Sequence, residues 1–462
     1  MINYFNFKKL NGQYLLTNDF GKYAFLTPND FHELITNGAV TDNNLNDELC
    51  RKKFVYTSSL KSFVDNNTYL MNDAKEYLFH PTQLHIFVVT NVCNMQCVYC
   101  QAQNGRSIPN GFMNEETAKR AVEIAMQSPS NHLQFEFQGG EPLLNFEIIK
   151  LIVDYSKQIS NGKMIDYSIV SNLTLLTDDM LNYIKDNHIS ISTSVDGNIE
   201  LHNSNRPYRD GSGSYESVCQ SIDRVKKEAL NIGALQTTTR QSLKNSHQIV
   251  DTYLELGFHS ISLRPLTPLG CAEKDWEEIG YTADEFVEFY KESFDYILER
   301  NKYAYFREGI ASIFLKKIFE GYGANYMELR SPCGAALGQI AYYYDGNVYT
   351  CDEGRMASEM GNQSFCLGNV HDTDYNQLMD NDICKVVCAS SILESLPSCA
   401  DCVYQPYCGV CPVVNFTLNK DIYEKAPDGY HCAINKGVLD ILFNKLQQND
   451  EYTVDTFWRW IK

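Results

Sequence analysis

The sequence lacks long apolar runs and is poor in positive charge. No stretch of about eighteen consecutive apolar residues occurs in the chain, so the sequence predicts no membrane-spanning helix. Lys and Arg number 39 against 58 Asp and Glu, for a formal net charge of −19. Because phosphate neutralisation needs surplus cations, this balance disfavours a general nucleic-acid-binding role. The N-terminal MINYFNFKKL also lacks the basic, apolar and small-residue order of a signal peptide, so we expect a cytoplasmic protein.

Cysteine is abundant instead, and its positions are uneven. Of the 16 cysteines, three lie within residues 93–100 and ten within residues 333–432. In a chain without a secretion signal, such clusters favour metal binding or catalysis over disulfides. A length of 462 residues also exceeds what one small core needs, so two or three domains are expected.

The pattern of elements divides the chain into four parts and predicts an α/β fold. Residues 1–75 have short strands followed by two helices, as in a compact winged-helix-like module, with an extension packed on the main domain as the alternative. Residues 80–270 alternate strand and helix six times, which predicts a parallel sheet in a partial (β/α)6 barrel. Residues 271–330 are expected to form a helical bridge, and residues 331–462 a cysteine-rich domain. The six expected barrel strands are 84–90, 133–137, 167–171, 189–195, 235–239 and 260–264.

The first cysteine cluster directly follows the first expected strand. Cys93, Cys97 and Cys100 stand in one short loop, with three and then two residues between them. Three thiolates can hold three irons of a [4Fe–4S] cluster and leave the fourth iron open to a small molecule. No nearby histidine has the spacing of a zinc ligand, but a zinc site and unligated cysteines remain the alternatives on spacing alone.

The octapeptide 93–100, CNMQCVYC, resembles the signature of the radical S-adenosylmethionine (SAM) superfamily, CxxxCxφC with an aromatic φ. The resemblance implies that SAM chelates the open iron. It also implies that one electron from the cluster releases a 5′-deoxyadenosyl radical, which abstracts hydrogen from the substrate. Tyr99 matches the aromatic position beside the adenine, with ordinary packing as the alternative.

A glycine-rich motif after the second expected strand extends this resemblance. The motif resembles the family's GGEP, which holds the SAM amino group, and consists of Gly139, Gly140, Glu141 and Pro142. Paired glycines let the backbone approach a ligand closely, and a carboxylate there can pair with an ammonium. A plain glycine turn is the alternative.

Two later strand ends match further SAM contacts by position. Ser171 and Asn172 match the ribose contact, although Leu173 stands where the family often has glycine. Ser194 and Arg206 correspond to the region of the SAM carboxylate, and a structural salt bridge is the alternative for Arg206.

The C-terminal cysteines resemble the SPASM extension, which holds two auxiliary [4Fe–4S] clusters and implies three clusters in all. By position, one auxiliary cluster has the ligands Cys399, Cys402, Cys408 and Cys432, and the other has Cys333, Cys351 and Cys411. Two residues, not the family's three, separate Cys408 from Cys411. The three-cysteine cluster therefore either keeps an open iron or is closed by Cys384, Cys388 or another residue. A zinc knuckle is the alternative for residues 399–411.

Asp352 follows Cys351 directly, just after an expected β-hairpin around Asp345 and Gly346. In the sulfatase-maturing branch of the family, the matching aspartate is a candidate catalytic base. A carboxylate beside a cluster could accept the proton that a substrate loses on oxidation. A turn or surface role is the alternative.

Most SPASM enzymes act on ribosomally made peptides or proteins, and residues 14–18 and 263–266 resemble the His-Xaa-Ser-system maturases. We therefore expect a maturase that abstracts a hydrogen atom from a precursor peptide and oxidises or crosslinks it. Residues 1–75 would pair an edge strand with the peptide's leader, and a flavodoxin- or ferredoxin-type protein would donate electrons. The alternatives are an anaerobic sulfatase-maturating enzyme that makes formylglycine, and a non-catalytic iron–sulfur binding protein.

Overall fold

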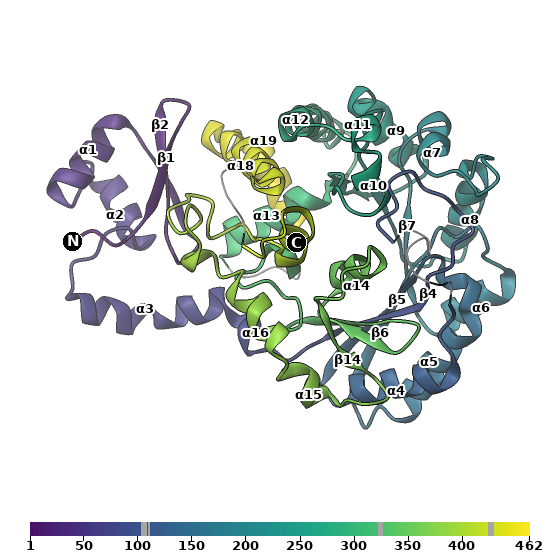
Figure 1. Cartoon of the computed structure of the whole chain (residues 1–462). Helices are drawn as coiled ribbons and strands as arrows, with labels where there is room; N and C mark the ends of the chain where they lie inside the picture. Colours follow the sequence, from purple (N-terminus) through teal and green to yellow (C-terminus); the bar gives the residue numbers. More distant parts are fainter. Residues whose placement is uncertain (103–108, 110, 322–326, 424–428) are drawn as a thin grey trace.

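The N-terminal part of the chain is a small antiparallel sheet followed by helices. The computed structural model describes residues 1–102, 109, 111–321, 327–423 and 429–462. The sheet has the strand order β1 (Asn6–Leu10), β2 (Gln13–Thr17) and β3 (Tyr23–Leu26). Three helices follow (Figure 1), namely α1 (Pro28–Asn37), α2 (Asn43–Arg51) and α3 (Leu60–Ala74).

Helix α3 differs from the expectation of two helices in this part of the chain. Its sequence, LKSFVDNNTYLMNDA, is mostly polar or exposed, and only Phe63 and Asn67 are buried. Apolar periodicity therefore does not mark it. The helix begins where the Ser59 hydroxyl accepts a hydrogen bond from the Ser62 amide at 3.2 Å.

The central sheet confirms the expected α/β fold with a mostly parallel sheet. It has nine strands in the order β10-β8-β7-β6-β5-β4-β12-β13-β14, and the first seven are parallel to one another. The barrel strands are β4 (Leu84–Thr90), β5 (His132–Gly139), β6 (Met164–Val170), β7 (Ser190–Ser194), β8 (Ile232–Thr237) and β10 (Leu263–Arg264). The expected strand 260–264 is split, because β9 (Ser260–Ile261) pairs instead with β11 (Arg307–Glu308).

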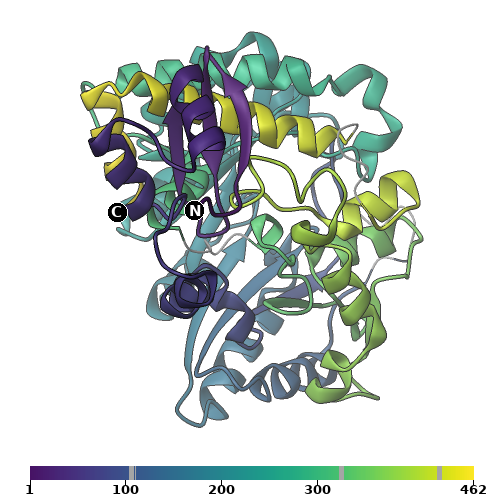
Figure 2. The same ribbon diagram turned by 90° about the vertical axis from the view of Figure 1, so that its left-hand side faces the viewer.

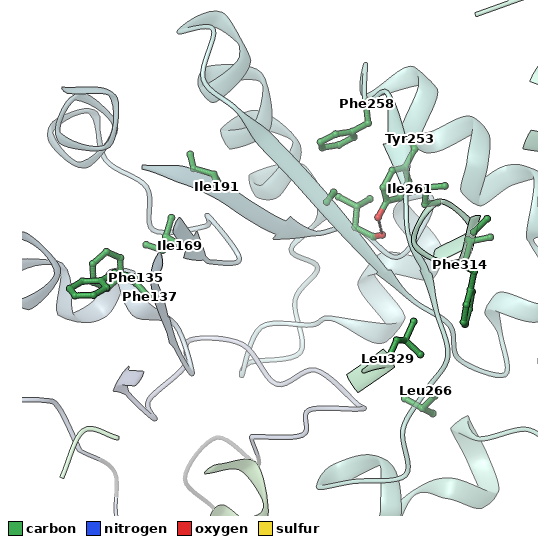
Figure 3. Close-up of a cluster of buried hydrophobic side chains, with 14 of the residues drawn as sticks. Phe135, Phe137, Ile169, Ile191, Tyr253, Phe258, Ile261, Leu266, Phe314 and Leu329 are labelled. Atoms are coloured by element: carbon green, nitrogen blue, oxygen red, sulfur yellow. Dashed lines mark hydrogen bonds between the residues drawn. The ribbon is translucent and has the colours of Figure 1, made fainter. Parts of the chain in front are cut away.

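Helices cover the outer face of this sheet (Figure 1). They are α4 (Glu115–Met126), α5 (Phe146–Gln158), α6 (Asp178–Asp186), α7 (Ile199–Asn205), α8 (Tyr215–Lys227) and α9 (Ser246–Glu255). Phe135, Phe137, Ile169 and Ile191 come from three neighbouring strands and are buried in the core (Figure 3). The alternate strand residues, such as Glu136, face the inside of the barrel, because successive side chains of a strand point to opposite faces.

The remaining helices and strands bridge and then complete the barrel. The expected hairpin is present as β12 (Gln339–Tyr342) and β13 (Asn347–Tyr349), and β14 (Cys366–Asn369) follows. Strand β12 pairs with β4, so the C-terminal part continues the barrel sheet. The helices are α10 (Cys271–Lys274), α11 (Trp276–Ile279), α12 (Ala283–Arg300), α13 (Gly309–Glu320), α14 (Asp352–Glu359), α15 (Tyr375–Met379), α16 (Asp382–Ala389), α17 (Pro412–Asn419), α18 (Tyr430–Gln448) and α19 (Glu451–Ile461).

The N-terminal sheet, drawn in purple at the front of Figure 2, lies against helix α18. Lys8 forms an ion pair with Asp440 of this helix at 2.7 Å. Thr17 donates from its hydroxyl to the Val403 carbonyl at 2.6 Å, so the sheet also contacts the C-terminal cysteine run. Within the described ranges, no helix combines the length and the apolar character that crossing a membrane requires.

Candidate active site

The carboxyl ends of the parallel strands open into one large cavity of about 710 Å³. Most of the candidate site residues line it: Cys93, Cys97, Tyr99, Cys100, Gly139, Gly140, Ser171, Asn172, Ser194, Arg206, Asp352, Cys399, Cys402, Cys408, Cys411 and Cys432. Four others are buried in the surrounding protein, namely Glu141, Pro142, Cys333 and Cys351. Residues that are up to about 340 positions apart in the sequence thus meet at the strand ends, where this class of fold carries its chemistry.

The glycine pair of the GGEP motif packs on the backbone that leads into the cysteine loop. A Cβ atom on Gly139 would lie 2.4 Å from the Thr90 carbonyl oxygen, and one on Gly140 would lie 2.4 Å from the Val92 carbonyl oxygen. The Gly140 amide donates to the Thr90 carbonyl at 2.9 Å. Only glycine allows such an approach, so these residues set the position of the segment immediately before Cys93.

The Glu141 carboxylate is buried and already hydrogen-bonded within the protein. It accepts from the Ser171 hydroxyl at 2.7 Å, the Asn172 amide at 2.8 Å and the Leu143 amide at 3.0 Å. Burial raises the pKa of Glu141, although these donors oppose the shift. The carboxylate therefore ties the motif to the end of β6, whereas the Gly139 and Gly140 backbone is the part of the motif that faces the cavity. Pro142 begins a short 3-10 helix, Pro142–Asn145.

The turn after β6 holds the side chains expected at the ribose. The side-chain amide of Asn172 donates to the side-chain oxygen of Asn94 at 3.0 Å. This bond joins the turn to the cysteine loop. Leu173 has a φ of 61°, in the left-handed region that favours glycine. This chain therefore keeps a glycine-type turn with a leucine whose side chain is fully buried.

The far side of the cysteine loop is held by the segment after α7. The Gln96 amide donates to the Pro207 carbonyl, and the Val98 amide donates to the Asn205 carbonyl, both at 2.9 Å. Arg209 donates from Nε to the Cys93 carbonyl at 2.6 Å. No sequence motif marks Arg209, because it binds a backbone oxygen more than one hundred residues away.

Tyr99, Asp196 and Arg206 form a buried polar network beside the loop. The Tyr99 hydroxyl donates to Asp196 at 2.7 Å and accepts from the Arg206 guanidinium at 2.8 Å. Asp196 also accepts from the Asn205 side chain at 3.1 Å. Burial raises the pKa of Asp196, while the positive charge of Arg206 opposes this shift. Arg206 thus binds Asp196 through Tyr99, and Asp196 is a site residue that could have been found from its place next to the strand end at Ser194.

The three thiols of the loop lie close enough to repel one another when ionised. Burial and the negative charge of a neighbouring Cys97 thiolate raise the pKa of Cys93 to about 12. Burial has the largest effect on Cys100 and likewise raises its pKa. The negative charges of Cys97 and Cys93 act in the same direction. Three thiolates in this loop therefore need a cationic centre between them, and an iron–sulfur cluster fits that requirement. Across the described residues, no three His, Cys, Asp or Glu side chains are placed to hold a single metal ion.

Seven of the C-terminal cysteines lie in two groups of neighbours. Burial raises the pKa of Cys351, and thiolates at Cys411 and Cys333 act in the same direction, so these three are neighbours. The second group comprises Cys399, Cys402, Cys408 and Cys432. Burial and then the negative charges of Cys432 and Cys402 raise the pKa of Cys408 to about 11.

Cys384 and Cys388 lie on helix α16, and neither is among the residues that line the cavity. The Cys384 thiol donates to the Leu378 carbonyl at 3.3 Å. This contact favours a packing role for Cys384 around α16 over a role as the fourth ligand of the three-cysteine cluster.

Asp352 is the first residue of α14 and lines the cavity next to the barrel strands. Arg355, which is 1% exposed, binds Asp352 through its guanidinium and also pairs with Glu359 at 3.1 Å. Arg355 also donates to the Gln138 side chain of β5 at 3.4 Å. The ion pair holds the Asp352 side chain at the wall of the cavity.

Comparison with known proteins agrees with this geometry. The family model described as Radical SAM superfamily matches residues 87–245. An uncharacterised protein of Methanocaldococcus jannaschii is 33% identical over 183 residues, which is 40% of this chain and 62% of that protein. The serine-type anaerobic sulfatase-maturating enzyme of Bacteroides thetaiotaomicron is 23% identical over 367 residues, which is 74% of this chain and 85% of the enzyme.

Two kinds of solved structure share the fold. A structure of anSMEcpe with bound AdoMet superposes with a TM-score of 0.69 at 21% sequence identity, covering 82% of this chain and 98% of that one. Streptococcus suis SuiB, in a crystal structure with its precursor peptide SuiA, has a TM-score of 0.57 at 15% identity. The SuiB comparison covers 92% of this chain and 99% of that one. It therefore extends over more of this chain than the anSMEcpe comparison does.

Proposed function

We propose that this chain, whose residues 87–245 match the Radical SAM superfamily model, is a radical SAM enzyme that matures a ribosomally made peptide by hydrogen abstraction followed by oxidation or crosslinking. Bound SAM and a [4Fe–4S] cluster on the three-cysteine loop would supply a 5′-deoxyadenosyl radical. We propose two auxiliary [4Fe–4S] clusters on the C-terminal cysteine groups. One observation carries the proposal: eight of the ten candidate cluster cysteines, including all three of the loop, line a single cavity together with Asp352.

Groups around the loop are suited to holding SAM. The Gly139 and Gly140 backbone faces the cavity and can receive the amino group. Within the described chain, the buried Nε of Arg206 has no hydrogen-bond partner, so it is a donor for the SAM carboxylate. Tyr99 presents its ring to the same cavity, and Ser194 and Asn172 offer polar atoms from neighbouring strand ends.

Asp352 is the proposed proton acceptor. It lines the cavity beside Gln138 and Glu136 of β5, and it follows the candidate cluster ligand Cys351. The ion pair with Arg355 positions the carboxylate at the cavity, where it could take a proton from substrate.

Residues 1–75 are proposed to recognise the precursor peptide. The N-terminal sheet has β1 and β3 as edge strands, and an extended leader could add to such an edge through backbone hydrogen bonds. SuiB, whose comparison covers 92% of this chain, has been crystallised with its precursor peptide SuiA. We further propose a cytoplasmic location and a flavodoxin- or ferredoxin-type electron donor.

A second candidate function is anaerobic maturation of a sulfatase to formylglycine. It is favoured by the position of Asp352 directly after Cys351 and by the similarity to the Bacteroides thetaiotaomicron sulfatase-maturating enzyme. A Ser or Cys side chain in the same cavity would then be the oxidised group.

Anaerobically reconstituted protein, SAM and dithionite test these proposals together. The expected result is 5′-deoxyadenosine, and a loss of two hydrogens per site in a precursor peptide coexpressed from a neighbouring gene. Oxidation of a sulfatase-derived Ser or Cys peptide instead would select the second candidate. Absence of 5′-deoxyadenosine with every peptide would leave the non-catalytic iron–sulfur protein as the explanation.

A further inference from the structure

A buried lysine beside the second C-terminal cysteine group is surrounded by neutral acceptors. Lys317 of α13 is only 8% exposed. Its ammonium donates to the carbonyls of Leu329 at 2.5 Å and Tyr407 at 2.8 Å, with the Cys408 carbonyl at 3.5 Å. Burying a cation is unfavourable unless a negative charge lies nearby. Burial lowers the pKa of Lys317 to about 7, and of the negative groups that oppose this shift the Cys408 thiolate acts more strongly than the Glu394 carboxylate. Cys408 belongs to the group of four cysteines.

Helix α18 adds two more donors to the same group. The Asn435 side-chain amide donates to the Cys408 sulfur at 3.6 Å. Lys436 hydrogen-bonds the Cys432 sulfur. Because Cys432 and Lys436 are four residues apart, they share one face of the helix. Both Asn435 and Lys436 line the cavity. The four cysteines thus have two cations and an amide donor around them.

The other cysteine groups have different surroundings. Cys351 has the Glu353 carboxylate as a near neighbour. Cys93 lies near both the Glu141 carboxylate and the Arg206 guanidinium, whose charges oppose each other. Arg330 is a cation near Cys333 of the three-cysteine group. Each of the other two groups thus has a cation opposed by a carboxylate, whereas the group that contains Cys408 has Lys317 and Lys436.

We propose that Lys317, Asn435 and Lys436 raise the reduction potential of the auxiliary cluster on Cys399, Cys402, Cys408 and Cys432. The inference rests on the proposed function, because it takes this cluster to be present. A cluster with four thiolates is an anion whose negative charge grows by one on reduction. Nearby cations and hydrogen bonds to sulfur favour the more negative form. This cluster would then be the one of the three that is most easily reduced.

The test is a redox titration of the reconstituted holoenzyme, followed by electron paramagnetic resonance and made without peptide substrate. Lys436→Met and Lys317→Met should each lower the reduced-to-oxidised ratio about tenfold at a fixed potential, a shift of about 59 mV for one electron. The shift should appear in one signal, the same one that Cys408→Ala abolishes. Lys445→Met is the matched control on α18, since Lys445 pairs with Asp295 at 2.7 Å, and it should leave every potential unchanged.

Unchanged potentials in Lys436→Met, or equal shifts of all signals, would overturn the inference. If Lys317→Met does not fold, Asn435→Leu and Lys436→Met decide the question, because both positions are partly exposed on α18. Wild-type protein with too little iron for this cluster would also overturn it. In that case SAM cleavage still reports on the proposed function, so the two failures are distinguishable.

Discussion

Tyr99 and Asp196 are joined by a 2.7 Å hydrogen bond, although 97 residues separate them in the sequence. Tyr99 belongs to the cysteine loop, and Asp196 lies just beyond the end of β7. The carboxylate is fully buried. This bond therefore fixes the orientation of the Tyr99 ring relative to the barrel before any ligand binds.

Replacing Tyr99 with Phe should weaken SAM binding about tenfold, or about 1.4 kcal/mol. The variant keeps the ring, but it leaves Asp196 without its closest donor and leaves Arg206 without an acceptor. Equilibrium binding of SAM to the reconstituted protein measures the effect. Tyr155→Phe, which removes a hydroxyl that donates to Glu123 on the outer helices, is the control and should bind SAM normally. Equal affinities for both variants would contradict the positioning role of this bond.

Replacing Gly140 with Ala should destroy the site on the three-cysteine loop. The new Cβ would lie 2.4 Å from the Val92 carbonyl oxygen, so the backbone before Cys93 has to move. We expect about four fewer irons per chain, corresponding to one lost cluster, together with loss of 5′-deoxyadenosine formation. Gly233→Ala is the control, because nothing lies within 4 Å of its added Cβ. Full iron content in Gly140→Ala would show that this segment can shift freely.

Replacing Asp352 with Asn should separate SAM cleavage from product formation. The amide keeps the size of the side chain but cannot accept a proton from substrate. Peptide product should therefore fall about 100-fold or more, while 5′-deoxyadenosine continues to form. Asp382→Asn, at an exposed carboxylate paired with Lys385, serves as the control. A parallel loss of both products would assign Asp352 a structural role through Arg355.

The buried histidine of β4 predicts acid sensitivity. Burial lowers the pKa of His85 to about 3 in the folded protein, against about 6.5 in an unfolded chain. Above the unfolded value both states are neutral and stability is complete. As pH falls from about 6.5 toward 3, only the unfolded state binds the proton, and the free energy of unfolding falls by up to about 1.4 kcal/mol per pH unit. Burial also lowers the pKa of His202 to about 3 and of His431 to about 4. Unfolding temperatures between about pH 8 and pH 4 should show this decline, and His85→Phe should reduce it by the share of one histidine. The exposed His247→Gln variant should follow the wild type.

Much of the fold could be predicted from the sequence because its signals are local. The apolar run of β4 and the alternation in β5 mark strands by themselves, and the CxxxCxφC spacing marks the loop between strand and helix. Helix α3 was missed for the converse reason, since its polar sequence carries no apolar period and it begins at a serine cap. The expected strand 260–264 is split because Arg307 of β11 pairs with Ser260 of β9. No local sequence pattern predicts this long-range pairing.

The candidate site could be predicted as a set of residues, but the partners of those residues could not. Glu141 was expected to reach SAM, yet its carboxylate is bonded to Ser171 and Asn172. These contacts join separate strand ends, so they depend on how the sheet is assembled. The bond from Arg209 to the Cys93 carbonyl could not be predicted for the same reason.

The contact between the N-terminal sheet and the C-terminal cysteine run gives a further prediction. The Asn6 side chain is 7% exposed and donates to the carbonyls of Ala400 and Cys402, at 3.0 and 3.1 Å. Asn6→Leu removes both bonds. The Cys402 carbonyl keeps its bond from the Gln405 amide at 2.9 Å, whereas the partly buried Ala400 carbonyl loses its donor, at a cost of about 1–3 kcal/mol. We expect faster loss of the auxiliary cluster signal in air, measured by absorbance. Asn66→Leu, at an exposed position of α3, is the control and should lose signal at the wild-type rate.

Because β12 pairs with β4, the barrel and the C-terminal part of the chain depend on each other for a complete sheet. Gln339 through Tyr342 occupy the hydrogen-bonding edge of β4 that would otherwise be open. A chain ending near residue 330 would therefore present a bare apolar strand to other molecules and should self-associate. Exchanging the C-terminal part between relatives should succeed only where β12 keeps its register against β4. The same pairing therefore sets the distance between the three-cysteine loop and the C-terminal cysteine groups.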